Sequence, residues 1–597
     1  MYTARSRVCE IDFQIEKTHE GPCFICFGEA KVERPTWVFL FIDVRSHHAS
    51  GKITFARNMR AEILEDFMKK LFGFILTVAL VMGLGALVSC KKTSAHNKDT
   101  LVVSAGYALI NGDYEPWSWD YGYEGIMFFH SALLKVNVDL VVENDLAKSY
   151  TISDDGLIYT FILRDDVKFS DGTPLTAADV VFTYKTAQGA DGGVDLTMLK
   201  NAEVVDGGVR FTLNKVFSPF IRTTASLGIV PEHAYNDKYK LNPIGTGPFK
   251  MKQIDVDQQL IIEPNPYYYG KKSAFKQITL LKIDEQRALA AAKSGELDVV
   301  MVNPEYAREK IEGFHLETIK TSDNRGFNLP LVPEQKNAKG IVVGNNVTSD
   351  PAVRRALNIG VSRQEIINNA LNGIGTPSWV RFEPLPWANM EPGLKDNQVE
   401  EAKKLLEDAG WKDTDGDGVR EKNGIRCAFK ITGRADDLQR YNLAVALAEN
   451  AKKLGIEITA QVMNWGEAKA ISRNVPTCIG TGSYSYYDVY TAFYSELGSV
   501  NQNPTNLANA AMYSNKTTDT YINAMLAARS DAEAIVQAKL AQYDGKTGPN
   551  VDMPYIWLAN IDHCYFVRDG LSLGNQRIHP HGHGMPVVQN MNEWRYE

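Results

Sequence analysis

Apolar side chains recur at three- and four-residue intervals in several stretches of the chain, the spacing that places them on one face of a helix. These stretches predict helices at residues 285–294, 352–359, 363–371, 399–409 and 436–454. Shorter apolar or alternating runs predict strands at residues 101–104, 159–163 and 456–459. Because helices and strands are intermixed along the chain, the pattern predicts α/β lobes.

One helix start carries an additional local signal. Thr176 is followed three residues later by Asp179, directly before the apolar run at 180–182. A hydroxyl at the N-cap and an acid at the third helical position each accept a hydrogen bond from the other's backbone N–H. A helix is therefore expected to begin just after Thr176.

An uncharged stretch lies inside the chain, where the sequence from residue 68 reads MKKLFGFILTVALVMGLGALVSCKK. Two lysines, an apolar stretch and small residues before Cys90 are typical of a lipoprotein signal, here residues 68–89. The Cys90 thiol would then carry a lipid that anchors the protein to the outer face of the cytoplasmic membrane. The alternative is a transmembrane helix, because about 20 apolar residues span a bilayer. Both interpretations place the residues after Cys90 outside the cytoplasm.

Residues 1–67 precede this signal and are not expected to belong to the fold. A functional signal lies at the amino terminus, so we hypothesise an over-extended start and translation from Met68. Residues 64–66 can be encoded by a purine-rich stretch that resembles a bacterial ribosome-binding site. Cys23 and Cys26 have a zinc-like spacing, but no second pair follows them.

Length and composition narrow the classes of function. A chain of 597 residues is long enough for two or three structural units. It carries 64 basic and 72 acidic side chains, a net charge of −8, without a long block of lysine and arginine. A nucleic-acid partner is therefore not expected. After Cys90 only Cys427, Cys478 and Cys564 remain, which predicts buried thiols and no disulfide framework.

One long block and several shorter ones carry a family signature. The long block, at residues 155–182, reads DGLIYTFILRDDVKFSDGTPLTAADVVF. The shorter blocks follow in order: PIGTGPF at 243–249, NPYYYG at 265–270, SGELD at 294–298, DPAVRRAL at 350–357 and AGWKDTDGDG at 409–418. Together they resemble the family 5 extracytoplasmic solute-binding proteins, which serve oligopeptide, dipeptide and nickel ABC importers.

The resemblance implies a two-lobed periplasmic-binding-protein fold of type II, large peptide-binding class, with two interlobe crossovers. Residues 91–325 and 553–597 would form the first lobe, and residues 326–552 the second. The lobes would close over a solute, and the permease of an ABC importer would select the closed form. The chain has no G-x-x-x-x-G-K-[ST] loop, so ATP hydrolysis is expected on a separate subunit, and no cofactor is expected here.

An enzyme is the rival class of protein. The sequence contains no G-x-S-x-G elbow, no H-E-x-x-H helix and no carboxylate pair whose spacing stands out. A carrier is therefore favoured. Incubation with candidate peptides separates the two classes, because an enzyme would turn them over and a carrier would retain them.

Two aromatic clusters supply candidate ligand contacts. Trp117 and Trp119 follow the first predicted strand, where the resemblance implies a loop at the cleft. Trp379 and Trp387 form a second cluster on the other lobe. Aromatic faces can pack against ligand side chains, although packing inside the protein is the alternative for each of them.

A third candidate is the block SYSYYDVY at residues 483–490. Peptide binders of the family carry an Asp in this region that grips the ligand's amino terminus, and the nearest position here is Tyr486, with Asp488 two residues on. Nickel-chelate binders of the family share a Tyr-Asp step like Tyr487-Asp488, but their Trp and a nearby downstream His are missing here. We therefore expect Tyr486, Tyr487 and Asp488 to form a cleft wall, and an oligopeptide or dipeptide ligand is favoured over a nickel chelate.

Two further patterns raise the question of metals. Asp413, Asp415 and Asp417 are spaced like the start of a calcium loop, but Gly424 stands where a bidentate Glu belongs, so a polar turn is favoured and Glu421 is the alternative ligand. His579, His581 and His583 alternate, and alternate side chains of an extended segment share a face. They could converge on nickel, copper or zinc, with a packed turn as the alternative.

Overall fold

The computed structural model describes residues 11–14, 50–53, 97–105, 107–119, 121, 128–190, 192–581 and 585–597. They fall into two units, residues 1–96 and residues 97–597. In the first unit, β1 (Ile11–Gln14) pairs antiparallel with β2 (Ser50–Ile53). Residues 68–89 and Cys90, to which the signal and the lipid were assigned, lie outside the described residues. Within the described part, no helix is long and apolar enough to cross a membrane.

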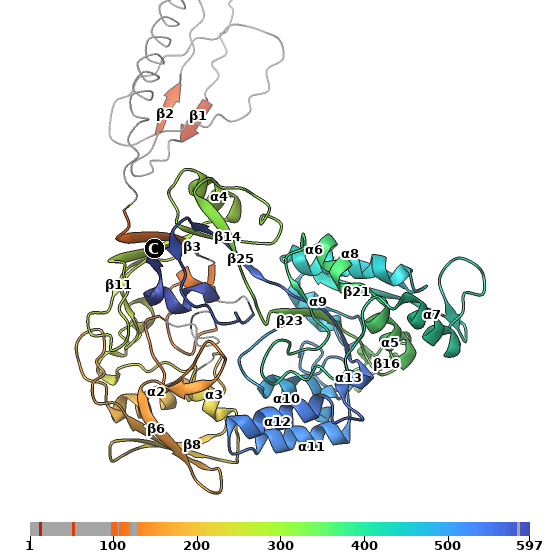
Figure 1. The fold of residues 1–597 in the computed structure, drawn as a ribbon, viewed down its shortest axis with the longest axis horizontal. Coiled ribbons are helices and arrows are strands. Elements are labelled where there is room, and N and C mark those ends of the chain that lie inside the picture. Colours follow the sequence, from red (N-terminus) through yellow and green to blue (C-terminus); the bar gives the residue numbers. More distant parts are fainter. Residues whose placement is uncertain are drawn as a thin grey trace, which may run out of the picture. The chain divides into compact units, whose positions relative to one another are not determined.

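The larger unit is built around a mixed sheet that contains strands from both ends of its chain (Figure 1). Its strands, in spatial order, are β10 (Phe249–Asp255), β11 (Gln259–Pro264), β12 (Gln277–Lys282), β3 (Thr100–Ala105), β13 (Val299–Val302), β25 (His563–Arg568) and β14 (Phe314–Ile319). The central strand β3 is parallel to β12 and β13, and α4 (Glu285–Lys293) connects those two neighbours. Strand β25, which comes from the carboxy-terminal part of the chain, lies between β13 and β14.

A second, antiparallel sheet extends the same lobe. Its strands, in spatial order, are β6 (Ala147–Ile152), β7 (Ile158–Leu163), β9 (Gly208–Leu213) and β8 (Leu199–Val205). Helix α2 (Ala177–Gln188) packs on β8 and begins with the predicted capping box of Thr176 and Asp179. The short helix α3 (Phe220–Thr224) follows β9 and leads toward the other lobe.

The second lobe has its own sheet and a helical layer. The sheet runs in the order β18 (Thr376–Pro377), β24 (Tyr555–Asn560), β15 (Asn324–Asn328) and β23 (Cys478–Thr481). A parallel pair, β21 (Ala428–Arg434) and β22 (Glu457–Met463), is connected by α8 (Leu438–Lys452). The other helices of this lobe are α5 (Pro351–Gly360), α6 (Arg363–Ala370), α7 (Val399–Asp408), α9 (Trp465–Ile471), α10 (Tyr487–Phe493), α11 (Lys516–Leu526), α12 (Asp531–Gln542) and α13 (Pro549–Asp552).

Short elements complete the described chain. The two-stranded pairs are β4 (Leu134–Val136) with β5 (Val142–Asn144), β16 (Gln335–Lys336) with β17 (Val342–Val343), β19 (Glu421–Lys422) with β20 (Ile425–Arg426), and β26 (Leu571–Ser572) with β27 (Arg595–Tyr596). The 3₁₀ helices are η1 (Tyr107–Ile110), η3 (Glu232–Ala234), η4 (Tyr239–Leu241), η5 (Ser495–Gly498) and η6 (Pro586–Glu593).

The chain crosses between the lobes twice, between β14 and β15 and between β24 and β25. The crossovers lie side by side, because the Ile561 N–H donates to the Asp323 carbonyl (2.9 Å) and the Thr321 hydroxyl donates to the Ile561 carbonyl (2.7 Å). This is the two-lobed α/β fold with two crossovers that the resemblance implied. The return to the first lobe was expected at residue 553, whereas β24 still pairs in the second lobe. Because β24 is buried throughout, its apolar sequence does not indicate which sheet it joins.

The elements predicted from periodicity are confirmed, and their ends differ from the prediction by at most four residues. Cys427, Cys478 and Cys564 are buried free thiols, as expected.

Candidate functional site

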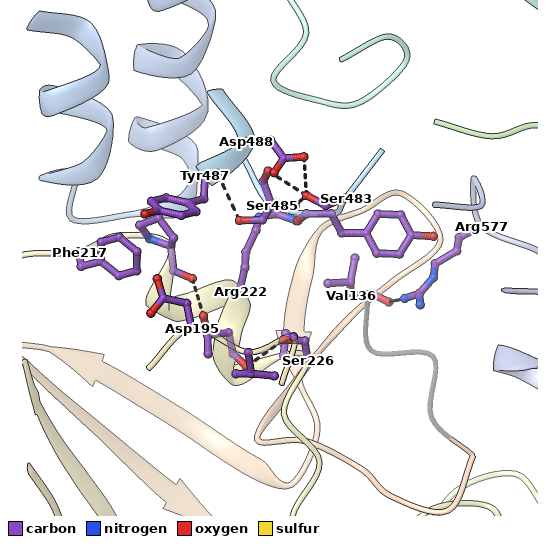
Figure 2. A pocket seen from close by; sticks show the side chains of 16 residues that line it. Val136, Asp195, Phe217, Arg222, Ser226, Ser483, Ser485, Tyr487, Asp488 and Arg577 are labelled. Atoms are coloured by element: carbon purple, nitrogen blue, oxygen red, sulfur yellow. Dashed lines mark hydrogen bonds between the residues drawn. The ribbon is translucent and has the colours of Figure 1, made fainter. Parts of the chain in front are cut away.

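A cavity of about 210 Å³ lies between the two lobes (Figure 2). The first lobe contributes Val136 of β4, residues 193–195 before β8 and residues in and around α3. The second lobe contributes the segment from the end of β23 to the start of α10. The lining residues are Val136, Gly193, Val194, Asp195, Phe217, Pro219, Arg222, Thr223, Ala225, Ser226, Ser483, Tyr484, Ser485, Tyr487, Asp488 and Arg577.

The second-lobe wall is formed by a tight turn that ends in a helix. Gly482 has φ +147°, and a Cβ there would meet the Ser322 carbonyl oxygen at 2.3 Å, so the turn requires glycine. The Ser485 hydroxyl then accepts a hydrogen bond from the Tyr487 N–H (3.2 Å), where α10 begins. Tyr487 and Asp488 thereby reach the cavity from the first turn of α10.

Asp488 is a half-buried carboxyl group with a local hydroxyl partner. The Ser483 hydroxyl donates to its Oδ2 at 2.8 Å. Burial raises the pKa of Asp488, while the nearby charge of Arg381 and the bond from Ser483 act in the opposite direction. The group can therefore serve as an acceptor in its ionised form or as a donor in its protonated form.

Tyr487 and Phe217 meet across the cavity from opposite lobes. Their ring centroids are 5.4 Å apart in an edge-to-face arrangement, and Tyr487 also stacks on Tyr490 of its own helix (5.1 Å). Burial raises the pKa of Tyr487 to about 12, so its hydroxyl stays protonated at neutral pH. These rings give the cavity an apolar side that can pack against a ligand.

Arg222 connects the lobes beside the cavity. Its guanidinium donates to both carboxylate oxygens of Asp531 (2.9 and 2.7 Å) and to the Tyr484 carbonyl (3.0 Å). Ser218, four residues earlier, donates its hydroxyl to the Met525 carbonyl (2.7 Å). Arg222 is buried and fully engaged, so its charge serves the contact between the lobes.

Arg577 reaches the same cavity from the carboxy-terminal segment. Its Nη1 donates to the Val136 carbonyl (3.1 Å), and its guanidinium lies 4.6 Å from the centroid of the Tyr484 ring. Its Nε is buried without a hydrogen-bond partner. A second cavity of about 480 Å³ shares the lining residues Arg577, Val136 and Ala225 with the first, so the two cavities adjoin at these residues.

The structure places the predicted aromatic residues in different surroundings. Tyr486 lies behind the cavity, fully buried, with its ring 6.2 Å from that of Trp387. Trp117 is buried against Tyr235 in the first lobe, whereas Trp119 is 58% exposed. Trp379 lies in the second lobe beside the guanidinium of Arg363 and lines a separate small cavity. Of the predicted ligand contacts, the structure brings only Tyr487 and Asp488 to the interlobe cavity.

His579 and His581 take different partners at the lobe crossovers. His579 is buried, with its Nδ1 3.1 Å from Nδ1 of His563, and burial lowers its pKa well below the ordinary value. His581 pairs with Asp323 at 2.6 Å. Burial alone would raise the pKa of Asp323, but the charges of Arg325 and His581 hold it well below its usual range. His583 lies outside the described residues, so the three-histidine metal site stays a prediction.

Asp413, Asp415 and Glu421 bring their carboxylate oxygens within 4.8 Å of one another. Asp413 accepts the N–H groups of Gly416 and Gly418, which makes it part of a turn. Glu421 likewise accepts from Thr414. These bonds are those of the polar turn that the sequence favoured.

Sequence reasoning missed Arg222, Arg577 and Phe217. None of them lies in a pattern that sets it apart from other residues of its type. Arg577 and Asp195 reach the cavity from segments that are distant in sequence, and only the folded chain brings them together.

Comparison with known proteins gives consistent matches. The family described as bacterial extracellular solute-binding proteins, family 5 Middle, matches residues 141–504. Protein XP55 of Streptomyces lividans is 32% identical over 472 residues, 75% of this chain and 82% of that protein. The oligopeptide-binding protein AppA of Bacillus subtilis is 30% identical over 393 residues, 61% of this chain and 70% of AppA. The structure of NikZ from Campylobacter jejuni in complex with Ni(L-His) matches with a TM-score of 0.63 at 25% identity, covering 83% of this chain and 99% of NikZ.

Proposed function

Because this chain belongs to family 5 of the bacterial extracellular solute-binding proteins, it is a solute-binding protein of the ABC-importer type and not an enzyme, and we propose that its ligand is a short peptide. The supporting observation is the interlobe cavity, which combines the rings of Phe217 and Tyr487 with polar groups of the 483–488 segment. An extended peptide can be held by backbone hydrogen bonds while aromatic pockets accept varied side chains. The relative AppA is named for oligopeptide binding.

Binding would favour closure of the lobes. The cavity has walls from both lobes, so a ligand in it makes all its contacts only when the lobes are together. Delivery to the permease of an ABC importer then follows from recognition of the closed form.

A nickel chelate is the second candidate ligand, because NikZ was solved in complex with Ni(L-His). Native mass spectrometry of protein purified from its own membrane separates the two. We expect a heterogeneous ladder of peptide masses. One sharp adduct with a nickel isotope pattern would overturn the peptide proposal.

We also propose that a lipid on Cys90 holds the protein at the outer face of the membrane, because residues 68–89 have the pattern of a lipoprotein signal. Cys90→Ala is expected to release the protein from membranes or to leave it unprocessed, as seen by fractionation and intact mass. Unchanged anchoring of a processed chain would contradict the proposal.

A further inference from the structure

Arg577 makes few hydrogen bonds for a guanidinium that lines a cavity. A guanidinium offers N–H donors on Nε, Nη1 and Nη2. In Arg577, Nη1 donates one hydrogen bond, to the Val136 carbonyl. The Nε donor is buried and unpartnered. No carboxylate among the described residues lies within ion-pair distance of it, although acids line the adjoining cavity.

The contrast with Arg222 in the same cavity is direct. Arg222 gives its donors to Asp531 and to two backbone carbonyls, so its charge is neutralised inside the protein. Arg577 instead rests on the face of Tyr484, whose hydroxyl donates to the neighbouring Ile578 carbonyl. This contact orients the guanidinium without neutralising it.

The position of Arg577 fits a ligand that extends through both cavities. The side chain lines the cavity of about 210 Å³ and the one of about 480 Å³, with Val136 and Ala225 as the other shared residues. A group bound at Arg577 would therefore lie at the junction, with space on either side of it. In Figure 2, Arg577 and Val136 lie on the side of the cavity opposite Phe217 and Tyr487.

We propose that Arg577 anchors a carboxylate of the ligand through its free N–H donors at the junction of the two cavities. A carboxylate matches the fork of a guanidinium and supplies the missing charge and acceptors. This inference rests on the proposed function and deepens it, because it assigns an anionic group to the ligand. The carboxylate belongs to the peptide terminus or to an acidic side chain, and an experiment can tell these apart.

The test measures the affinity of the full chain for three sets of short peptides. The first set has uncharged side chains and free carboxy termini, the second consists of the same peptides as amides, and the third consists of amides with one glutamate. We expect the native protein to bind the first or third set about ten- to a hundredfold more tightly than the second. Arg577→Gln should remove that preference, while Arg577→Lys should keep part of it.

The exposed Arg355 of α5 provides a matched control, since Arg355→Gln makes the same change of charge at a residue that lines neither cavity. The melting temperature of each variant without peptide reports on folding. A loss of carboxylate preference at an unchanged melting temperature supports the anchor. Equal binding of all three sets by the native protein, or an unchanged preference in Arg577→Gln, would overturn it while leaving peptide binding intact.

A chelate pair separates this inference from the peptide proposal. Ni(II) with L-histidine carries a carboxylate, and Ni(II) with histamine does not. If the peptides fail but the histidine complex binds selectively and Arg577→Gln abolishes the selectivity, the peptide function is wrong and the carboxylate anchor holds. If the native protein binds none of these probes, both proposals are overturned.

Discussion

The ion pair between Arg222 and Asp531 should act on ligand affinity more than on folding. It joins α3 of the first lobe to the start of α12 in the second, through two N–H donors at 2.9 and 2.7 Å. The side chain of Arg222 is 3% exposed and that of Asp531 is 23% exposed. Breaking a fully buried pair costs about 3–5 kcal/mol, and a surface pair contributes at most about 1 kcal/mol.

Asp531→Asn lies between these limits. The amide keeps one oxygen for Arg222, and the bonds from Arg222 to the carbonyls of Tyr484 and Leu140 remain. We therefore expect a cost of about 2 kcal/mol, borne by the closed arrangement of the lobes. Because ligand binding requires closure, the dissociation constant should rise about 30-fold. The free energy of unfolding without ligand should change by less than about 0.5 kcal/mol, because each lobe retains its own core.

The assay combines isothermal titration with a peptide that the native protein retains and urea unfolding of the ligand-free protein. Glu309→Gln is the matched control, because it removes the same charge from the exposed pair of Lys293 and Glu309 within one lobe. That variant should leave both quantities unchanged. The opposite result would be that Asp531→Asn lowers the free energy of unfolding by about 2 kcal/mol and leaves the affinity for the peptide unchanged. The pair would then be a permanent part of the fold, and the reasoning would be refuted.

Three further predictions concern the cavity wall, the pH dependence of stability and the sheet of the second lobe. Tyr487→Ala should weaken binding of a retained peptide about tenfold while Tyr487→Phe changes it little, since the ring contact with Phe217 carries the effect; equal losses in titrations of both variants would contradict this. Burial lowers the pKa of His130 to about 3, below its unfolded value of about 6.5, so its neutral form stabilises the protein above pH 6.5 and that stability is lost as the pH falls toward 3. Between pH 4 and 6, the free energy of unfolding measured in urea should therefore rise less steeply with pH in His130→Gln than in the native protein. An identical pH dependence in the two proteins would count against this role of His130. Asp145, whose pKa burial raises to about 6, contributes a slope of opposite sign in both proteins. Gly326→Ala should destabilise the fold by about 3 kcal/mol, because the new Cβ would meet the Ile556 carbonyl at 2.4 Å, whereas Gly466→Ala on exposed α9 should be neutral or slightly stabilising; similar urea midpoints for the two would refute the packing argument.

Periodicity predicted those helices that present a strong apolar stripe to a core. Helix α5, for example, buries Val353 and Leu357 and was recognised from their spacing. Helix α12 was missed, because its buried face consists mainly of Ala534, Ala538 and Ala541, and alanine gives a weak contrast between buried and exposed positions. It nevertheless supplies Asp531 at its first turn, so the missed helix contributes directly to the contact between the lobes.

The block at 483–490 shows how far a motif defines a site. The family resemblance located the segment, but a helix turns by about 100° per residue, so the three successive side chains from the N-cap into the first turn of α10 cannot all face the same way. Tyr486 therefore enters the core beside Trp387, while Tyr487 and Asp488 face the cavity. A one-residue uncertainty in where the helix begins is enough to exchange these roles.

The arginines of the cavity show why the remainder of the site required the folded chain. Arg222 and Arg577 have the same donors, and nothing in the sequence around either indicates whether a carboxylate will meet it. Asp531, which does meet Arg222, lies 309 residues away along the chain. Arg577 lines the same cavity and has no such partner among the described residues, so its charge is left for a group that the protein does not supply. Whether a cationic side chain holds the lobes together or selects the ligand is thus decided by the acceptors that tertiary structure brings to it.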